Sequence, residues 1–133
     1  MVTINISMGE LFDRMSILEI KLAKINDRSK LRIVEEELEK LKSKIIDPMN
    51  TLMCDKNKVW DLYDELYEVN LDLWNIEDRL RYMESIGDFS MEFISTARLV
   101  YKYNDRRYEL KCLIDIMFGE GTKEVKYFTT GKK

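Results

Sequence analysis

The sequence predicts an all-α protein, a four-helix bundle of two helical hairpins with a short extended C-terminal tail. Two observations carry this prediction. Apolar residues recur every three or four positions through four long segments, which is the period of an amphipathic helix. The chain also has only five Gly and one Pro in 133 residues, too few turn residues for a β-sandwich or barrel. Short connections between long helices make consecutive helices antiparallel neighbours.

The first hairpin is predicted from two amphipathic segments. Ser7 and Glu10 form the capping-box pattern that begins a helix, and apolar residues follow at helical spacing. Asp27 or Ser29 is expected to cap the second helix. The Asp-Pro pair at 47–48 is expected to end it, because a residue before proline disfavours helical backbone.

The second hairpin is predicted from two longer segments. Asp55 is expected to cap a third helix over about residues 56–86, which contain no Gly or Pro. Gly87 directly follows this predicted helix, at the position where glycine commonly ends a helix. Asp88 is then expected to cap a fourth helix over about residues 89–118.

The chain is expected to form one helical domain over residues 1–133. Gly119 and Gly121 are expected to end the last helix, with residues 119–133 as a flexible tail of weak strand character. No apolar run approaches 18 residues, and the start of the chain lacks a signal-peptide pattern. We therefore expect a cytoplasmic protein that makes no membrane contact.

The third and fourth predicted helices are longer than the first two, so the end of their hairpin is expected to overhang. An overhanging pair of helices that carries aromatic side chains is a natural surface for self-association. The sequence therefore predicts a homodimer or a larger homo-oligomer.

The composition counts against several chemistries. The 22 basic and 25 acidic side chains nearly balance, which counts against a protein that binds nucleic acid through bulk charge. His is absent, which removes the commonest general base and most zinc sites. Cys54 and Cys112 lie far apart and form no metal motif. We expect neither a metal nor a cofactor.

Polar residues that interrupt the apolar faces of the last two predicted helices are the candidates for function. On both helices, an amide and cations follow one face at helical spacing. Burying such groups unpaired would cost several kcal/mol each, so they pair with one another or line a ligand site. The candidate ligand-binding residues are Asn70, Trp74, Glu77 and Arg81 on the third helix and Tyr101, Asn104, Arg107 and Lys111 on the fourth.

Two interpretations of these residues stay open. In the first, they form a structural network, in which Glu77 or Glu19 neutralises the cations of the fourth helix. In the second, they line a site between helices, where Arg81, Arg107 and Lys111 bind a phosphate or carboxylate. The aromatic side chains would then form flat walls for a ring.

The same positions carry a family resemblance. The pattern V-N-x-x-L-W-x-I-E-D at 69–78, G-D-F at 87–89 and N-D-R-R at 104–107 resembles a small family of unknown function. Members of this family occur in bacteria and phages, and some lie near glycosyltransferases. Segments 9–13, 17–21, 97–101 and 124–127 match as well, so the resemblance spans nearly the whole chain. It implies no activity, but it implies that Asn70, Trp74, Glu77, Asp78 and residues 104–107 belong to one shared feature.

The expected function is that of a homo-oligomeric helical protein that binds a small anionic ligand, such as a nucleotide or nucleotide sugar. A phage-encoded protein of this kind would sequester a host nucleotide signal. An enzyme without His is one alternative. It would resemble helical chorismate mutases, or it would hold Mg²⁺ with carboxylates as nucleotide pyrophosphatases do. The carboxylates for the second version are Asp61, Asp64, Glu65 and Glu68. An adaptor without a ligand is the other alternative.

Overall fold

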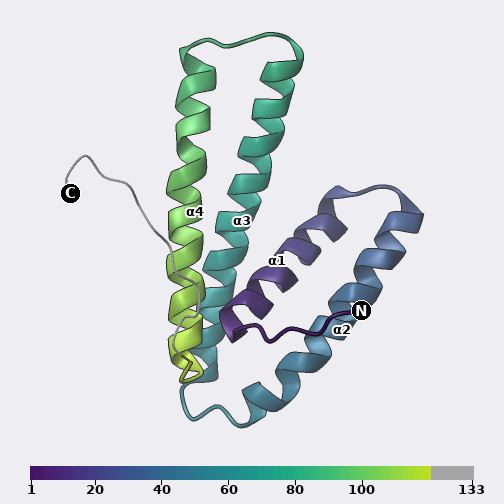
Figure 1. Cartoon of the computed structure of the whole chain (residues 1–133), viewed down its shortest axis with the longest axis vertical. Helices are drawn as coiled ribbons and strands as arrows, with labels where there is room; N and C mark the ends of the chain where they lie inside the picture. Colours follow the sequence, from purple (N-terminus) through teal and green to yellow (C-terminus); the bar gives the residue numbers. More distant parts are fainter. Residues whose placement is uncertain (121–133) are drawn as a thin grey trace, which may run out of the picture.

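A computed structural model describes residues 1–120 and contains four α-helices within them. These are α1 (Met8–Lys24), α2 (Arg28–Asn50), α3 (Lys56–Ser85) and α4 (Met91–Met117). The helices α3 and α4 form a long hairpin, and the shorter α1–α2 hairpin packs beside one half of it (Figure 1). The predicted four-helix bundle is therefore confirmed. Gly121 and most of the predicted tail lie outside the described residues.

Most helix ends lie where local sequence signals place them. Ser7, Asp27 and Asp55 are N-caps, and each side chain accepts a backbone N–H from the first turn of its helix. Gly87 follows α3 with a φ of 69°, and Gly119 follows α4 with the same φ. Because this left-handed conformation is cheap only for glycine, these two residues end their helices as predicted.

The second helix does not end at the Asp-Pro pair. Pro48 lies inside α2, which continues to Asn50, so that prediction is wrong. Pro48 lies in the last turn, where its missing N–H costs one hydrogen bond at most. The extra turn buries Met49 in the core, and its apolar contacts offset that cost.

The fourth helix begins two residues later than predicted. Asp88 is not its N-cap, since α4 starts at Met91 and Ser90 occupies the cap position. The Asp88 carboxylate instead accepts the backbone N–H of Ser90 at 3.0 Å. This short-range hydrogen bond closes the turn before the helix.

The hydrophobic core lies around α1, which packs against each of the other three helices. Phe12 of α1 is fully buried at its centre. The rings of Trp60 and Tyr63 each lie 5.6 Å from the Phe12 ring, and that of Phe118 lies 6.0 Å away. These aromatic neighbours come from α3 and from the end of α4, so one side chain joins three elements.

A close approach of α1 to α4 depends on Gly9. Its backbone N–H donates to Asp115 Oδ1 at 2.6 Å, and both groups are buried. A Cβ atom on Gly9 would lie only 2.2 Å from the backbone oxygen of Lys111 and 2.8 Å from Asp115 Oδ1. Only a residue without a side chain fits at this contact.

We expect Gly9→Ala to lower the free energy of unfolding by about 1–3 kcal/mol, because the added methyl group forces α1 away from α4. This loss should appear although alanine favours helix by about 1 kcal/mol. Urea denaturation followed by circular dichroism measures it. As a control, Arg32→Ala on the exposed side of α2 should change stability by no more than about 0.5 kcal/mol. A Gly9→Ala protein as stable as the unmodified chain would contradict the expectation.

Candidate functional site

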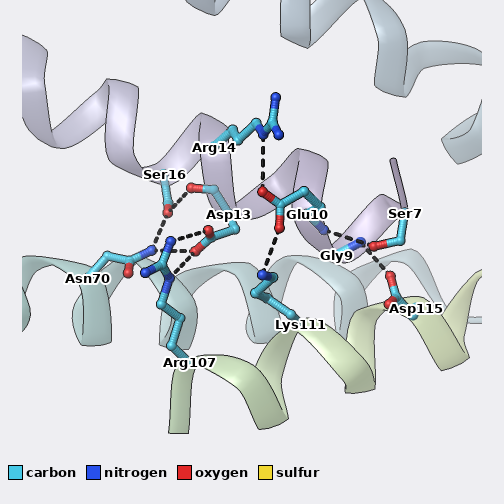
Figure 2. Close-up of polar contacts among 10 residues, drawn as sticks. All are labelled: Ser7, Gly9, Glu10, Asp13, Arg14, Ser16, Asn70, Arg107, Lys111 and Asp115. Carbon is cyan, nitrogen blue, oxygen red and sulfur yellow. Dashed lines mark hydrogen bonds and ion pairs between the residues drawn. The ribbon is translucent and has the colours of Figure 1, made fainter. Parts of the chain in front are cut away.

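The polar residues that interrupt α3 and α4 meet around one carboxylate of α1. Asp13 is only 1% exposed and accepts hydrogen bonds from both neighbouring helices (Figure 2). Arg107 donates from Nε to Oδ1 at 2.9 Å and from Nη2 to Oδ2 at 2.5 Å, a bidentate ion pair. Asn70 Nδ2 donates to Asp13 Oδ1 at 2.9 Å and to Ser16 Oγ at 2.7 Å. We call Asp13, Ser16, Asn70 and Arg107 the Asp13 network.

A second ion pair lies one turn further along the α1–α4 contact. Lys111 Nζ lies 2.7 Å from Glu10 Oε2, and the lysine side chain is only 12% exposed. Glu10 Oε1 also accepts from Arg14 Nε at 3.1 Å. Burial alone would raise the pKa of Glu10, but the hydrogen bonds from Lys111 and Arg14 outweigh it and leave that pKa below its usual value.

The end of α4 supplies carboxylates to the start of α1. Asp115 is 2% exposed and accepts the Gly9 N–H, and Glu120 Oε1 accepts the Met8 N–H at 3.0 Å. These N–H groups have no partner inside their own helix, and the positive end of the helix dipole favours the negative charges. Arg107, Lys111 and Asp115 thus form one stripe at four-residue spacing that contacts α1 along its first two turns (Figure 2).

The structure gathers some of the predicted site residues and leaves others apart. Asn70 and Arg107 meet at Asp13, with Lys111 beside them. The remaining five lie outside this network. Trp74 and Asn104 are half-buried, whereas Glu77, Arg81 and Tyr101 are exposed. Arg81 contacts Glu77 at 3.8 Å and Asp78 at 3.4 Å, both as exposed pairs within α3.

The acids that neutralise the α4 cations are not those that the sequence suggested. Asp13 and Glu10 take the place expected for Glu77 or Glu19. A signal for Asp13 was present, since Gly9, Asp13 and Ser16 share one helical face with a spacing of four and then three residues. That face lies in the interface with α3 and α4, and all three residues are buried.

A groove between α1 and α2 is lined by a second group of cationic side chains. This hollow of about 380 Å³, which we call the α1–α2 groove, has Ile17, Leu18 and Leu41 as its apolar lining. Its charged lining residues are Arg14, Lys21, Glu37, Lys40 and Lys44, four cations against one carboxylate. Within residues 1–120 the three lysines of the groove form no ion pair, in contrast to Arg107 and Lys111.

Another hollow, of about 420 Å³, lies among α1, α2 and α3. Glu19 lines it together with Lys42, Lys56 and Trp60, rather than facing the α4 cations. The adjacent Tyr63 hydroxyl is buried without a hydrogen-bond partner in the described residues. Burial, and then the Glu19 carboxylate, raise the pKa of the Tyr63 phenol well above 10.0, so this phenol stays protonated at neutral pH.

The carboxylates proposed as Mg²⁺ ligands lie on the exposed side of α3. They are Asp61, Asp64, Glu65 and Glu68. Within residues 1–120, no group of three or more Cys, Asp or Glu side chains is placed to hold a metal ion. Cys54 and Cys112 are both free thiols. No helix in the described part of the chain combines the length and the apolar character needed to cross a membrane.

The fold places the protein in the class of four-helix bundles, and partly buried ion pairs join its first helix to the fourth. Comparison with models of protein families, with curated proteins and with solved structures found no match. The family resemblance drawn from the sequence motifs therefore stays a prediction.

We expect Arg107→Ala to lower the free energy of unfolding by about 3 kcal/mol, because it leaves the buried Asp13 carboxylate without its ion-pair partner. Urea denaturation at neutral pH measures the loss. Arg106→Ala is the matched control. Arg106 lies next in the chain but forms exposed pairs with Glu65 and Glu109, so its loss should cost no more than about 1 kcal/mol. Equal effects of the two variants would contradict a structural role for the Asp13 network.

We expect Tyr63→Phe to be neutral or stabilising by up to about 1 kcal/mol, because it removes a buried hydroxyl that has no hydrogen-bond partner among residues 1–120. The pH dependence should change as well. Folding raises the pKa of Tyr63, so the neutral phenol favours the folded state. This contribution to the free energy of unfolding is complete below pH 10.0. It falls as the pH rises further, because the unfolded chain then loses the phenol proton and the folded chain keeps it. Between pH 9 and 11, the free energy of unfolding measured by urea denaturation should therefore fall less for Tyr63→Phe than for the unmodified chain. A cost of about 2 kcal/mol at pH 7 would instead indicate a hydrogen bond to the hydroxyl.

Proposed function

We propose that the protein binds a small anionic ligand that has an apolar part, and that the α1–α2 groove holds it. One observation carries the proposal: Lys21, Lys40 and Lys44 line an apolar groove and have no ion-pair partner within the described residues. Ammonium and guanidinium groups bind phosphate and carboxylate, and an apolar floor suits a ring or a short hydrocarbon. A nucleotide has both parts.

The groove is a better anion site than the stripe that the sequence suggested. Arg107 and Lys111 already neutralise Asp13 and Glu10, and a ligand there would have to displace a buried carboxylate. Displacing one partner of a buried pair costs about 3–5 kcal/mol. Lys40 and Lys44 are exposed and Lys21 is half-buried, so a ligand there replaces mainly hydration and counterions. The proposal therefore keeps the expected ligand class and moves the site to α1 and α2.

The lining of the groove favours binding over turnover. Glu37 is the only carboxylate among its described lining residues, and it lies beside Lys40 and Leu41 on α2. General acid–base catalysis needs a positioned group with a pKa close to the working pH. We therefore propose a binding protein. Because the cations are exposed, we expect moderate affinity that weakens as the salt concentration rises.

Isothermal titration with adenosine 5′-diphosphate, adenosine and inorganic pyrophosphate tests the site. We expect the diphosphate nucleotide to bind more tightly than either fragment, because only it engages both the cations and the apolar floor. Lys40→Glu with Lys44→Glu should weaken its binding at least tenfold, since each change replaces attraction by repulsion. Arg32→Glu, an exposed change on α2 outside the groove lining, serves as the control and should leave binding unchanged.

Two results would overturn the proposal. Binding of none of the three probes at low salt would remove the evidence for an anion site that accepts this class of ligand. Binding that is lost equally in the groove variant and in the Arg32→Glu control would show attraction to the general charge of the protein rather than to the groove.

A further inference from the structure

The hollow that Glu19 lines lies between two helices that do not pack closely together. Both α2 and α3 pack on α1, but within the described residues they make little contact with each other. Figure 1 shows α1 between α2 and the α3–α4 hairpin. The hollow measures about 420 Å³, and sites for small molecules measure about 300–1,000 Å³. We call it the Glu19 hollow.

The lining of the Glu19 hollow is largely apolar and includes one aromatic ring. Met15 of α1 and Met49 of α2 line it and are buried in the core. Trp60 of α3 lines it as well and stays 38% exposed. The Trp60 ring lies edge-on 5.6 Å from the ring of Phe12 and 5.7 Å from that of Tyr63. These contacts hold the ring in place, so the hollow offers a preformed aromatic surface to a ligand.

Glu19 places a carboxylate in this apolar lining. It is half-buried, and within residues 1–120 it forms no ion pair. The buried Tyr63 hydroxyl lies nearby and has no hydrogen-bond partner in the same part of the chain. Glu19 is close enough to raise the pKa of this phenol, so a neutral hydroxyl and an ionised carboxylate are neighbours here. A ligand that brings a cation to Glu19 supplies the partner that the protein itself does not.

Two lysines line the same hollow on its other helices. Lys42 belongs to α2 and Lys56 begins α3, and both are exposed. Lys42 lies 4.0 Å from Glu39 in an exposed pair along α2, whereas Lys56 forms no ion pair with a described residue. Neither lysine pairs with Glu19. The hollow therefore presents a negative group and positive groups separately, over one apolar surface.

We propose that the Glu19 hollow binds a free α-amino acid with a large apolar side chain. The ammonium group of the ligand pairs with Glu19, its carboxylate pairs with Lys42 and Lys56, and its side chain packs on Trp60. Charge-assisted hydrogen bonds of both signs then form at once. A ligand with a single charge satisfies only one part of the lining and is repelled by the other, which gives the site its specificity. This hollow and the α1–α2 groove share no lining residue.

Three probes with the same phenyl ring test the proposal by isothermal titration at pH 7 and low salt. L-Phenylalanine carries both charged groups, 2-phenylethylamine carries only the ammonium group, and 3-phenylpropanoate carries only the carboxylate. We expect L-phenylalanine to bind at least tenfold more tightly than either of the other two, because only it satisfies both signs of charge in the hollow.

Two variants assign the charged groups. Glu19→Gln keeps the shape of the side chain and removes its charge, so it should weaken L-phenylalanine and 2-phenylethylamine at least tenfold but not 3-phenylpropanoate. Lys42→Gln with Lys56→Gln should weaken L-phenylalanine and 3-phenylpropanoate but not 2-phenylethylamine. Glu36→Gln, an exposed change on α2 outside both hollows, is the control and should leave all three affinities unchanged.

Circular dichroism establishes that each variant keeps its helix content, and the lysine variant carries the test if Glu19→Gln does not fold. Absence of L-phenylalanine binding at its solubility limit would overturn the proposal. So would 2-phenylethylamine or 3-phenylpropanoate binding as tightly as the amino acid, or a folded variant that weakens all three probes alike. Glu19→Gln should bind adenosine 5′-diphosphate like the unmodified chain, so this proposal and that for the α1–α2 groove fail independently.

Discussion

The buried carboxylate of Asp13 is the constraint on which the arrangement of the bundle depends. A carboxylate without water costs several kcal/mol unless ion pairs and hydrogen bonds satisfy it. Here Arg107 supplies two donors from α4 and Asn70 supplies one from α3. Both donors sit on helices that already pack together, so the rotation and height of α1 on the hairpin are set. The close approach at Gly9 follows from that position, as do the contacts of Asp115 and Glu120 with the first turn of α1.

The sequence predicts the fold well because its signals are local. Helical period, the caps at Ser7, Asp27 and Asp55, and the glycines after the last two helices all act within a few residues. The two misplaced helix ends have different causes, one in the packing of the core and one in a local turn. The helix α2 continues through Pro48 because Met49 gains a place in the core. The start of α4 moves because Asp88 closes a turn instead of capping the helix.

The sequence predicts the polar residues that α3 and α4 contribute to the site, but not their partners on α1. Asn70, Arg107 and Lys111 could be found because each interrupts an apolar face. Their partners could not be chosen, because several carboxylates have the right chemistry and the rotation of α1 is a property of the packed bundle. The stripe on α3 also changes character along its length. Asn70 is buried under α1, whereas Arg81, with a side chain 72% exposed, lies beyond its end. A helical wheel treats both positions alike.

Glu10 connects the α1–α2 groove to the interior of the bundle, and its geometry indicates how independent the two are. Its carboxylate accepts from Arg14, which lines the groove, and from Lys111, which belongs to the α4 interface. The Lys111 contact is the shorter, at 2.7 Å against 3.1 Å, and Lys111 is far less exposed than Arg14. An anion that draws Arg14 toward the groove therefore leaves Glu10 paired with its stronger partner. The groove can gain a cation for ligand binding while the contact between α1 and α4 keeps its charge balance.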